Sequence, residues 1–205
     1  MLHVIDHPVI RERLTHIRSV DSETAAFREA LHDIARLMCF EVTRDLETKP
    51  VEVETPLTKT QGHQLARPTV LVPILRAGVG LMNGFTEILS EASVGYIGLY
   101  RDEETHQPHS YYCKLPAHIA ESDVILIDPM LATGGSAADS ADELKKAGAA
   151  HIRFACLIAA PEGVKAFEER HPDIPIYTAS LDECLDENAY IVPGLGDAGD
   201  RYFGT

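Results

Sequence analysis

The sequence has no long hydrophobic run. Its longest uninterrupted apolar segment extends only from Phe154 to Ala160, whereas a membrane-spanning helix needs roughly 20 such residues. The first eight residues, Met1 to Pro8, include no charged region followed by an apolar stretch, so no signal peptide is predicted. We therefore expect no membrane partner.

Cysteine is scarce, and the four thiols lie far apart in the sequence. They form neither a Cys-x-x-Cys pair nor a zinc-binding spacing, at Cys39, Cys113, Cys156 and Cys184. His106 and His109 are close to each other, but no third ligand of suitable spacing accompanies them. We expect reduced thiols in a cytoplasmic protein, and we assign no metal-binding residues.

Basic residues are few. The chain has 18 Lys and Arg against 32 Asp and Glu, which gives a formal net charge of −14. A general binder of nucleic acid or of an anionic membrane needs a basic face, so this balance disfavours both classes. If the chain binds a highly anionic ligand, the attraction must be local, from backbone amides, a few arginines and a divalent cation.

Several familiar catalytic and nucleotide-binding motifs are also missing. No glycine precedes a Lys-Ser or Lys-Thr pair, which excludes a nucleotide P-loop. The run from Gly78 through Gly80 to Gly84 resembles a dinucleotide fingerprint, but its third glycine comes one position late, and no acid follows at the expected distance. Ser136 is not in a Gly-x-Ser-x-Gly motif, and no Ser–His–Asp or Cys–His arrangement is convincing.

The hydrophobic pattern predicts one α/β domain over residues 1–205, with a mostly parallel central sheet flanked by helices. We expect strands at Thr69–Leu75, Val94–Tyr100, Asp123–Asp128, His151–Ala159 and Ile174–Ala179. We expect helices beginning at Asp21, following Arg76 to near Glu91, ending near Gly148, and covering Glu162–Arg170. The first helix has an apolar stripe that we assign to the core, at Phe27, Leu31, Ile34, Met38 and Val42. The polar segment Arg101–Lys114 is predicted to be a mobile loop or hairpin arm.

The segment Val124–Ser136 is the most informative part of the chain. A buried strand ends at Asp128, and the small-residue turn Thr133–Ser136 then opens a helix. Glycines allow several backbone N–H groups to converge, and the helix dipole favours an anion at that point. Because open α/β sheets bind ligands at the carboxyl ends of their strands, we prefer a phosphosugar site to an ordinary helix cap.

The same segment resembles the phosphoribosyl-diphosphate (PRPP) motif of type I phosphoribosyltransferases, and most closely that of the uracil-specific family. Many relatives have two adjacent acids at the start of the motif, whereas here Pro129 takes the second position. The resemblance continues in order along nearly the whole chain, through Asp45–Thr48, Val72–Gly78, Tyr100–Thr105, Ala159–Gly163 and Tyr190–Asp200. It implies the type I phosphoribosyltransferase fold and transfer of the phosphoribosyl group of PRPP to N1 of uracil, giving UMP and diphosphate in pyrimidine salvage.

The resemblance also implies the site residues. PRPP is expected to contact Arg76, Arg101, Asp128, Pro129, Met130, Leu131, Ala132, Thr133, Gly134, Gly135, Ser136 and Asp197. Uracil is expected to contact a carboxyl-terminal base-binding loop through Ile191, Gly196, Asp197 and Ala198. Arg76 and Asp128 are the residues we expect to act in catalysis, by stabilising the leaving group and the ribose, without a covalent nucleophile.

Further expectations follow from the resemblance. Mg²⁺ should bind together with PRPP, GTP is a candidate activator, and the chain should form a homodimer or a higher even assembly. Two alternatives stay open at this point. One is a phosphoribosyltransferase for another base, since the PRPP motif does not read the base; the carboxyl-terminal loop favours uracil. The other is an RNA-binding regulator with this fold, which the acidic charge disfavours.

Overall fold

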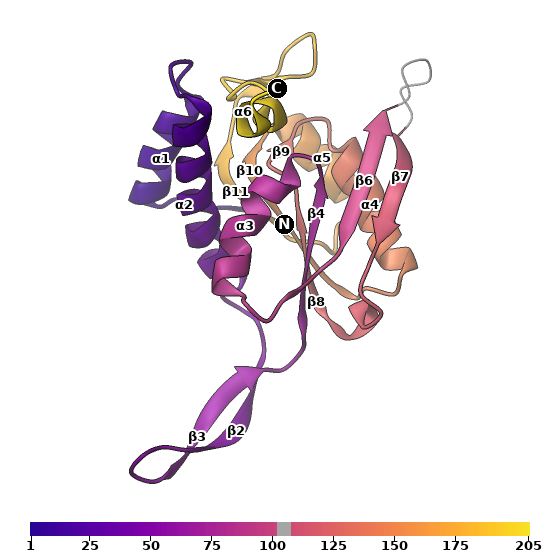
Figure 1. The fold of residues 1–205 in the computed structure, drawn as a ribbon. Helices are drawn as coiled ribbons and strands as arrows, with labels where there is room; N and C mark the ends of the chain where they lie inside the picture. The colour runs from indigo at the N-terminus through magenta and orange to yellow at the C-terminus, as the bar shows by residue number, and fades with distance from the viewer. Residues whose placement is uncertain (102–107) are drawn as a thin grey trace.

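The computed structural model describes residues 1–101 and 108–205, with side chains for residues 1–99 and 111–205. His106 therefore lies outside the described residues. The described chain forms a central sheet with helices on both faces and a two-stranded arm that projects from one end (Figure 1). This is the predicted α/β class.

The central sheet is mostly parallel. Its strands follow the order β1-β11-β10-β8-β4-β6-β7, with β5 beside β4 and β9 beside β10. All these pairings are parallel except that of β6 with β7. The bounds are β1 Leu2–Val4, β4 Thr69–Leu75, β5 Ser93–Val94, β6 Tyr96–Arg101, β7 Pro108–Lys114, β8 Asp123–Ile127, β9 Met130–Leu131, β10 His151–Ala159 and β11 Ile176–Leu181.

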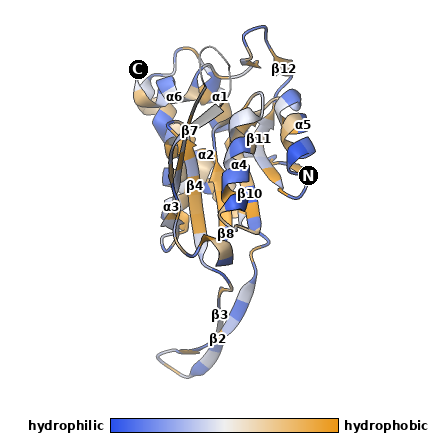
Figure 2. Cartoon of the chain, turned by 90° about the vertical axis from the view of Figure 1, so that its right-hand side faces the viewer, coloured by the Kyte–Doolittle hydropathy of each residue, from blue (hydrophilic) through white to orange (hydrophobic). Residues whose placement is uncertain are grey.

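Helices cover both faces of this sheet, as the near-continuous apolar sequences of β4, β8 and β10 predict. Three helices lie on one face, α1 (Pro8–Arg18), α2 (Thr24–Val42) and α3 (Gly78–Ile88), and two on the other, α4 (Gly135–Lys146) and α5 (Pro161–Arg170) (Figure 1). The central strands are strongly hydrophobic, whereas helices α4 and α5 contain many hydrophilic residues (Figure 2). A short 3₁₀ helix, Ile119–Glu121, precedes β8.

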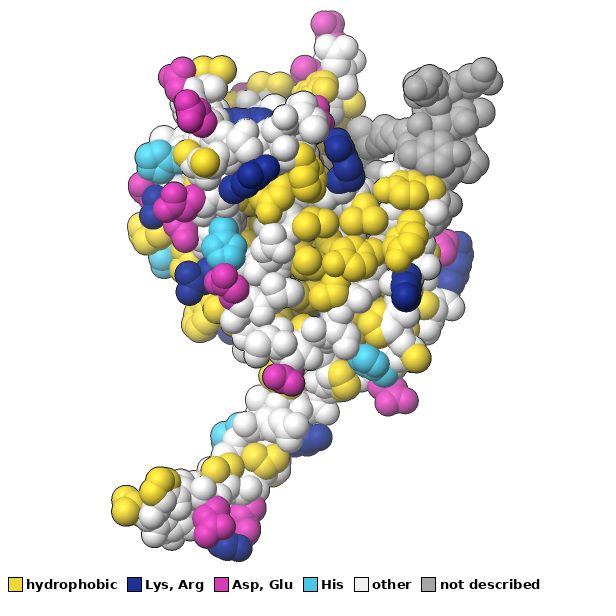
Figure 3. All heavy atoms as spheres, viewed as in Figure 1, with side chains coloured by type: hydrophobic (Ala, Val, Ile, Leu, Met, Phe, Trp, Pro, Cys, Tyr) yellow, Lys and Arg dark blue, Asp and Glu magenta, His cyan; other side chains and the backbone are white. Residues whose placement is uncertain are grey.

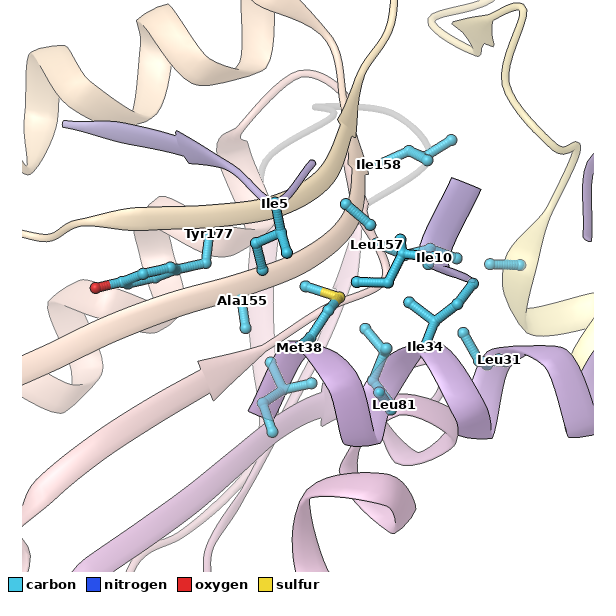
Figure 4. Close-up of a cluster of buried hydrophobic side chains, with 14 of the residues drawn as sticks. Ile5, Ile10, Leu31, Ile34, Met38, Leu81, Ala155, Leu157, Ile158 and Tyr177 are labelled. Atoms are coloured by element: carbon cyan, nitrogen blue, oxygen red, sulfur yellow. The ribbon is translucent and has the colours of Figure 1, made fainter. Parts of the chain in front are cut away.

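The predicted stripe on α2 is buried, with each of its five residues at most 1% exposed. It packs against side chains from the sheet and from α1 and α3. Figure 4 shows Ile34 and Met38 of α2 beside Ile10 of α1, Leu81 of α3 and Leu157 of β10. Helix α1 was not predicted, although its apolar positions Ile10, Leu14 and Ile17 recur at helical spacing and Pro8 stands in its first turn.

The arm is the hairpin of β2 (Thr48–Glu54) and β3 (Lys59–Leu65). It leaves the body at the end of the sheet where the parallel strands begin (Figure 1). The segment Arg101–Lys114, predicted to be a mobile loop or hairpin arm, belongs to a hairpin. It supplies the end of β6 and the whole of β7, at an edge of the main sheet. Nothing in the sequence analysis predicted β2 and β3.

The carboxyl-terminal segment is more regular than the predicted loop. A small hairpin of β12 (Cys184–Leu185) and β13 (Ile191–Val192) leads through a turn into the short helix α6 (Ala198–Phe203). Helix α6 lies at the carboxyl edge of the parallel strands, the end of the sheet opposite the arm (Figure 1). The first residues of α6, which were predicted to lie in an open loop, are thus part of a helix.

Candidate active site

The order of the strands brings three predicted site residues to one edge of the sheet. Strands β8, β4 and β6 are consecutive neighbours, and in register Ile127 pairs with Pro73 and Leu75 pairs with Gly98. Asp128 follows β8, Arg76 follows β4, and Arg101 is the last residue of β6. The chain continues from β4 to β6 on one side and returns to β8 on the other. Open α/β sheets bind ligands at such a switch point.

The segment after Asp128 is fixed by its neighbour β10. The carbonyl of Pro129 accepts hydrogen bonds from the N–H groups of Leu157 (3.0 Å) and Ile158 (3.1 Å). Met130 and Leu131 form β9 against the end of β10. The backbone from Pro129 to Leu131 is therefore an extension of the sheet, and it presents the following turn at the carboxyl edge.

The turn itself, Ala132 to Ser136, closes on the amino terminus of α4. Gly134 is the N-cap and has a left-handed backbone, with φ of 83°. A side chain there would also lie 2.8 Å from the carbonyl oxygen of Gly163 in α5. Only glycine fits both conditions without strain. The structure thus confirms a tight glycine turn opening a helix, which is the geometry that the phosphate-site interpretation requires.

The turn at Arg76 lies against this strand end. Ala77 is the N-cap of α3, and a Cβ atom placed on Gly78 would lie 2.6 Å from the carbonyl oxygen of Ile127. The Arg76 side chain is exposed, and its Nη2 lies 3.4 Å from Oδ1 of Asp200 in α6. Its guanidinium also sits 5.5 Å from the ring centre of Phe203. Arg76 is therefore available at the surface, in contact with the carboxyl-terminal helix.

The predicted uracil residues surround the start of α6. Asp197 is the N-cap, and its carboxylate accepts a hydrogen bond of 2.8 Å from the N–H of Asp200. Ile191 and Ala198 are buried, whereas Gly196 is exposed with φ of 77°. A Cβ on Gly199 would lie 3.6 Å from that of Ala77, so the start of α6 adjoins the Arg76 turn.

Asp128 has an unusual electrostatic environment. Burial raises the pKa of its carboxyl group to about 7, and a hydrogen bond from the backbone of Met130 partly opposes this rise. Among the side chains of residues 1–99 and 111–205, no cation contributes to this rise in pKa. A carboxyl group whose pKa is near neutral pH can ionise when a cation or a hydrogen-bond donor binds beside it. The side chain of Arg101, the other predicted cation of this edge, is outside the described part of the chain.

Sequence reasoning missed the residues that hold this edge together. Arg18 at the end of α1 pairs with Asp182, which follows β11, and Arg201 of α6 donates to the carbonyls of Ile17 (2.5 Å) and Leu195 (2.8 Å). The sequence predicts no role for Asp200, which ends the carboxyl-terminal run Tyr190–Asp200. Arg18 and Asp182 are 164 positions apart, so no spacing could have linked them.

Within residues 1–101 and 108–205, no group of three or more His, Cys, Asp or Glu side chains could hold a metal ion. Across the same residues no helix is long and apolar enough to cross a membrane. The four cysteines are free thiols, two of them buried.

The family model for uracil phosphoribosyltransferase matches residues 4–205. The chain belongs to the uracil phosphoribosyltransferase family. It is 57% identical over 203 residues to the uracil phosphoribosyltransferase of Ligilactobacillus salivarius, covering 98% of this chain and 97% of that protein. It is 56% identical over 205 residues to that of Streptococcus pneumoniae, covering 100% and 98%. The reaction of this family, transfer of a phosphoribosyl group from PRPP to uracil to form UMP, is the function of the chain.

Solved structures agree with the family. A protein from Aquifex aeolicus superposes with a TM-score of 0.94 at 34% identity, covering 100% of this chain and 99% of that one. Adenine phosphoribosyltransferase from Trypanosoma brucei gives a TM-score of 0.60 at 16% identity over 96% of this chain and 88% of that one, which shows a shared fold alone. The predicted type I phosphoribosyltransferase fold is confirmed.

Proposed function

We propose that the carboxyl edge of the sheet holds PRPP and uracil side by side. The observation that carries this proposal is the convergence of Asp128, the Arg76 turn and the start of α6 at the β8–β4 switch point. The turn Thr133–Ser136 cradles the 5′-phosphate, Asp128 faces the ribose hydroxyls, and Arg76 and Arg101 hold the diphosphate. The backbone from Asp128 through Leu131 and Ala132 forms the floor below PRPP, and Asp197 contacts it from α6.

Uracil occupies the space in front of Ile191 and the residues Gly196 to Ala198. Its recognised edge has an N3–H donor between two carbonyl acceptors. Exposed main-chain N–H and C=O groups around Gly196 can match this donor–acceptor pattern without side-chain donors. Because Gly199 adjoins Ala77, a base held here is next to a diphosphate held at the Arg76 turn.

The chemistry needs positioning and charge stabilisation. The bond between C1′ and the diphosphate breaks as N1 of uracil attacks C1′, and N1 releases its proton to solvent. Positive charge therefore develops on the ribose and negative charge on the leaving group. The Arg76 guanidinium stabilises the leaving diphosphate through paired donors that never lose their charge. The Asp128 carboxylate accepts hydrogen bonds from the ribose hydroxyls and stabilises the positive charge that develops on the ribose. Neither residue forms a covalent bond to substrate.

Phosphoribosyltransferases generally use Mg²⁺ with PRPP. The carboxylate of Asp128 is a hard oxygen donor of the kind that Mg²⁺ prefers, while Pro129 occupies the position of a second acid. A single carboxylate, with Pro129 in place of a second acid, fits a magnesium ion that arrives with PRPP and keeps several waters. When bound, the ion would neutralise part of the negative charge of the diphosphate. The chain itself, with a net charge of −14, provides little positive charge for this purpose.

We also propose a homodimer or a higher even assembly. The arm is exposed along both strands, and Leu57 at its tip is 95% exposed. An isolated two-stranded hairpin is marginally stable in water, so a second copy that covers the arm would stabilise it. Figure 3 shows further hydrophobic side chains gathered on the body over α3, β4 and β6. Sedimentation at micromolar concentration should show a dimer or larger species, and a single 22.5 kDa species would contradict this proposal.

One incubation series tests the substrates. Purified protein is mixed with PRPP, Mg²⁺ and one nucleobase at a time, and the nucleotide formed is identified. Only uracil should be consumed at an appreciable rate, with UMP and diphosphate as products. Nucleotide formation from another base at a comparable rate would contradict the base assignment. Activation by GTP and a cytoplasmic location stay predictions; adding GTP to the same assay tests the first.

A further inference from the structure

An ion pair with a buried carboxylate contacts the turn that lies within the proposed uracil segment. Asp182 follows β11 at the carboxyl edge, and its side chain is 1% exposed. Its two carboxylate oxygens accept hydrogen bonds from both terminal nitrogens of Arg18 (2.7 and 2.6 Å) and from the hydroxyl of Ser180 (2.7 Å). These bonds outweigh burial, which alone would raise the pKa of Asp182, so that its pKa is lowered. The carboxylate is charged and almost fully coordinated.

The remaining hydrogen bond of this carboxylate goes to the turn that precedes α6. Asp182 Oδ2 accepts from the N–H of Gly194 at 3.0 Å, and Nη1 of Arg18 donates to the carbonyl of the same glycine at 2.8 Å. One ion pair therefore binds both polar backbone groups of a single residue. In the sequence Gly194 lies between Ile191 and Gly196, two residues of the proposed uracil contact.

Arg201 fixes the next residue of the turn in a related way. It donates to the carbonyl of Leu195 while its other bonds reach Ile17 and Ser19 at the end of α1. Its guanidinium also lies 4.7 Å from the ring centre of Phe27. The turn before α6 is thus attached to the end of α1 at two successive residues, Gly194 and Leu195.

We propose that Arg18 and Asp182 are positioning residues for uracil. They set the place of Gly194 and thereby align the main-chain groups from Gly196 to Ala198 with the pyrimidine edge. This inference rests on the proposed role of that segment in binding uracil. A glycine-rich turn has many accessible conformations, and recognition through backbone groups requires that one of them be fixed beforehand. A buried, charged pair fixes it more firmly than neutral hydrogen bonds would.

A second ion pair in the molecule provides a matched comparison. Nη1 of Arg153 lies 3.3 Å from Oδ1 of Asp123, with side chains 12% and 6% exposed. This pair joins β10 to β8 at the amino ends of the strands, away from the proposed site. Removing the charge of Asp123 should therefore destabilise the fold without touching the turn before α6.

The test compares Asp182→Asn with Asp123→Asn. In Asp182→Asn, one oxygen becomes an NH₂ group, which cannot accept a hydrogen bond. At the Oδ2 position it loses the bonds from Gly194 and Arg18 Nη1, and at the Oδ1 position it loses the bond from Arg18 Nη2. In either orientation the charge is lost and the anchor of the turn is weakened. KM for uracil should rise about tenfold, the factor that corresponds to one lost hydrogen bond of a charged group. KM for PRPP and kcat at saturating uracil should stay within about twofold, because the chemistry is untouched. Asp123→Asn should lower the melting temperature and leave KM for uracil unchanged.

Arg18→Lys gives an independent reading if Asp182→Asn does not fold. A lysine keeps the charge but cannot donate to both carboxylate oxygens and the Gly194 carbonyl at once. It should raise KM for uracil in the same selective way. An unchanged uracil KM in either folded variant would overturn the inference, as would an equal rise in Asp123→Asn.

Gly196→Ala separates the failure of this inference from the failure of the proposed uracil site. If it leaves uracil KM unchanged, the uracil segment itself is misassigned; if it raises KM while Asp182→Asn and Arg18→Lys do not, only the positioning role fails.

Discussion

Arg76 and Asp200 form an ion pair across the proposed active site, with 3.4 Å between Nη2 and Oδ1. Both side chains are more than half exposed, so the pair contributes little to stability. The diphosphate of PRPP carries more negative charge than one carboxylate and offers paired oxygens to the guanidinium. We therefore expect PRPP to displace Asp200 from Arg76, which couples the start of α6 to the occupancy of the diphosphate site.

Arg76→Ala should lower turnover strongly while leaving the melting temperature unchanged. The loss of one donor aimed at developing charge costs about 10²–10³-fold in kcat at comparable anion sites. Arg76→Lys should be intermediate, since it keeps the charge but loses the planar fork. Steady-state kinetics with saturating uracil measures both. Arg11→Ala, which removes an exposed arginine paired with Asp6, is the control and should turn over normally. Normal turnover of Arg76→Ala would make Arg76 an ordinary surface charge.

Gly135→Val should abolish tight PRPP binding with the fold intact. Gly135 is the first residue of α4 and has no positive φ, so valine meets no backbone strain there, but its branched side chain blocks the approach of the 5′-phosphate. Calorimetric titration with PRPP, together with thermal melting, measures the two effects. Gly134→Val is expected to differ, because the left-handed backbone and the Gly163 carbonyl make it lower the melting temperature as well. Unimpaired PRPP binding by Gly135→Val would refute the phosphate site.

The stability and activity of the free protein should change with pH through Asp128. Its folded pKa, about 7, is above the ordinary value of 3.8, so the neutral form favours folding. This stabilisation is fully present below about pH 4 and is lost as pH rises through 7. Asp128→Asn should therefore melt at a higher temperature than the parent at pH 8, with the difference shrinking toward pH 4.

The same ionisation should appear in the kinetics of PRPP. If the ribose hydroxyls bind the carboxylate, kcat/KM for PRPP should rise with pH and level off above 7. In Asp128→Asn this rise should be absent, at a lower overall rate. The parent protein should be measured between about pH 5.5 and 8.5, a range on the order of three pH units around the midpoint. If its kcat/KM for PRPP does not change over this range, Asp128 does not titrate near 7.

Discrimination between uracil and cytosine tests whether main-chain groups recognise the base. Cytosine presents an amino donor where uracil has O4, and it lacks the N3 proton. Two mismatched positions at about 1–3 kcal/mol each predict a preference on the order of a hundredfold or more in kcat/KM. Ala198→Ser should retain this preference because the donors belong to the backbone. Gly196→Val should impair uracil itself, since φ of 77° strains any side chain. Similar kcat/KM values for the two bases would rule out this mode of recognition.

The parts of the fold that the sequence predicted share one property, which is periodic or continuous burial. The stripe on α2 and the apolar strands β4, β8 and β10 are buried in the structure, and their hydrophobic patterns therefore carried the information. The placement of Asp128 and Arg76 followed, because each comes directly after one of these strands. Only the lateral order of the strands, which no local pattern encodes, was needed to bring them together.

The parts that were missed lack this property or depend on distant partners. The strands β2 and β3 are exposed on both faces, so their hydrophobic pattern does not alternate with a core. The pairing of Arg18 with Asp182 joins residues 164 positions apart, and it became visible only once α1 and β11 were placed in space. Helix α6 has six residues in a glycine-containing segment, too short for a periodic signal.

The arm and the proposed site lie at opposite ends of the same parallel strands (Figure 1). Substitutions that redesign the contacts of the arm can therefore be chosen independently of those that alter substrate choice. A fluorescent label attached at the exposed tip near Leu57 would report on subunit exchange while leaving the substrate edge unobstructed. The parallel strands thus hold the proposed contact between copies, at the arm, apart from the proposed substrate site at the carboxyl edge, so that the two can be engineered separately.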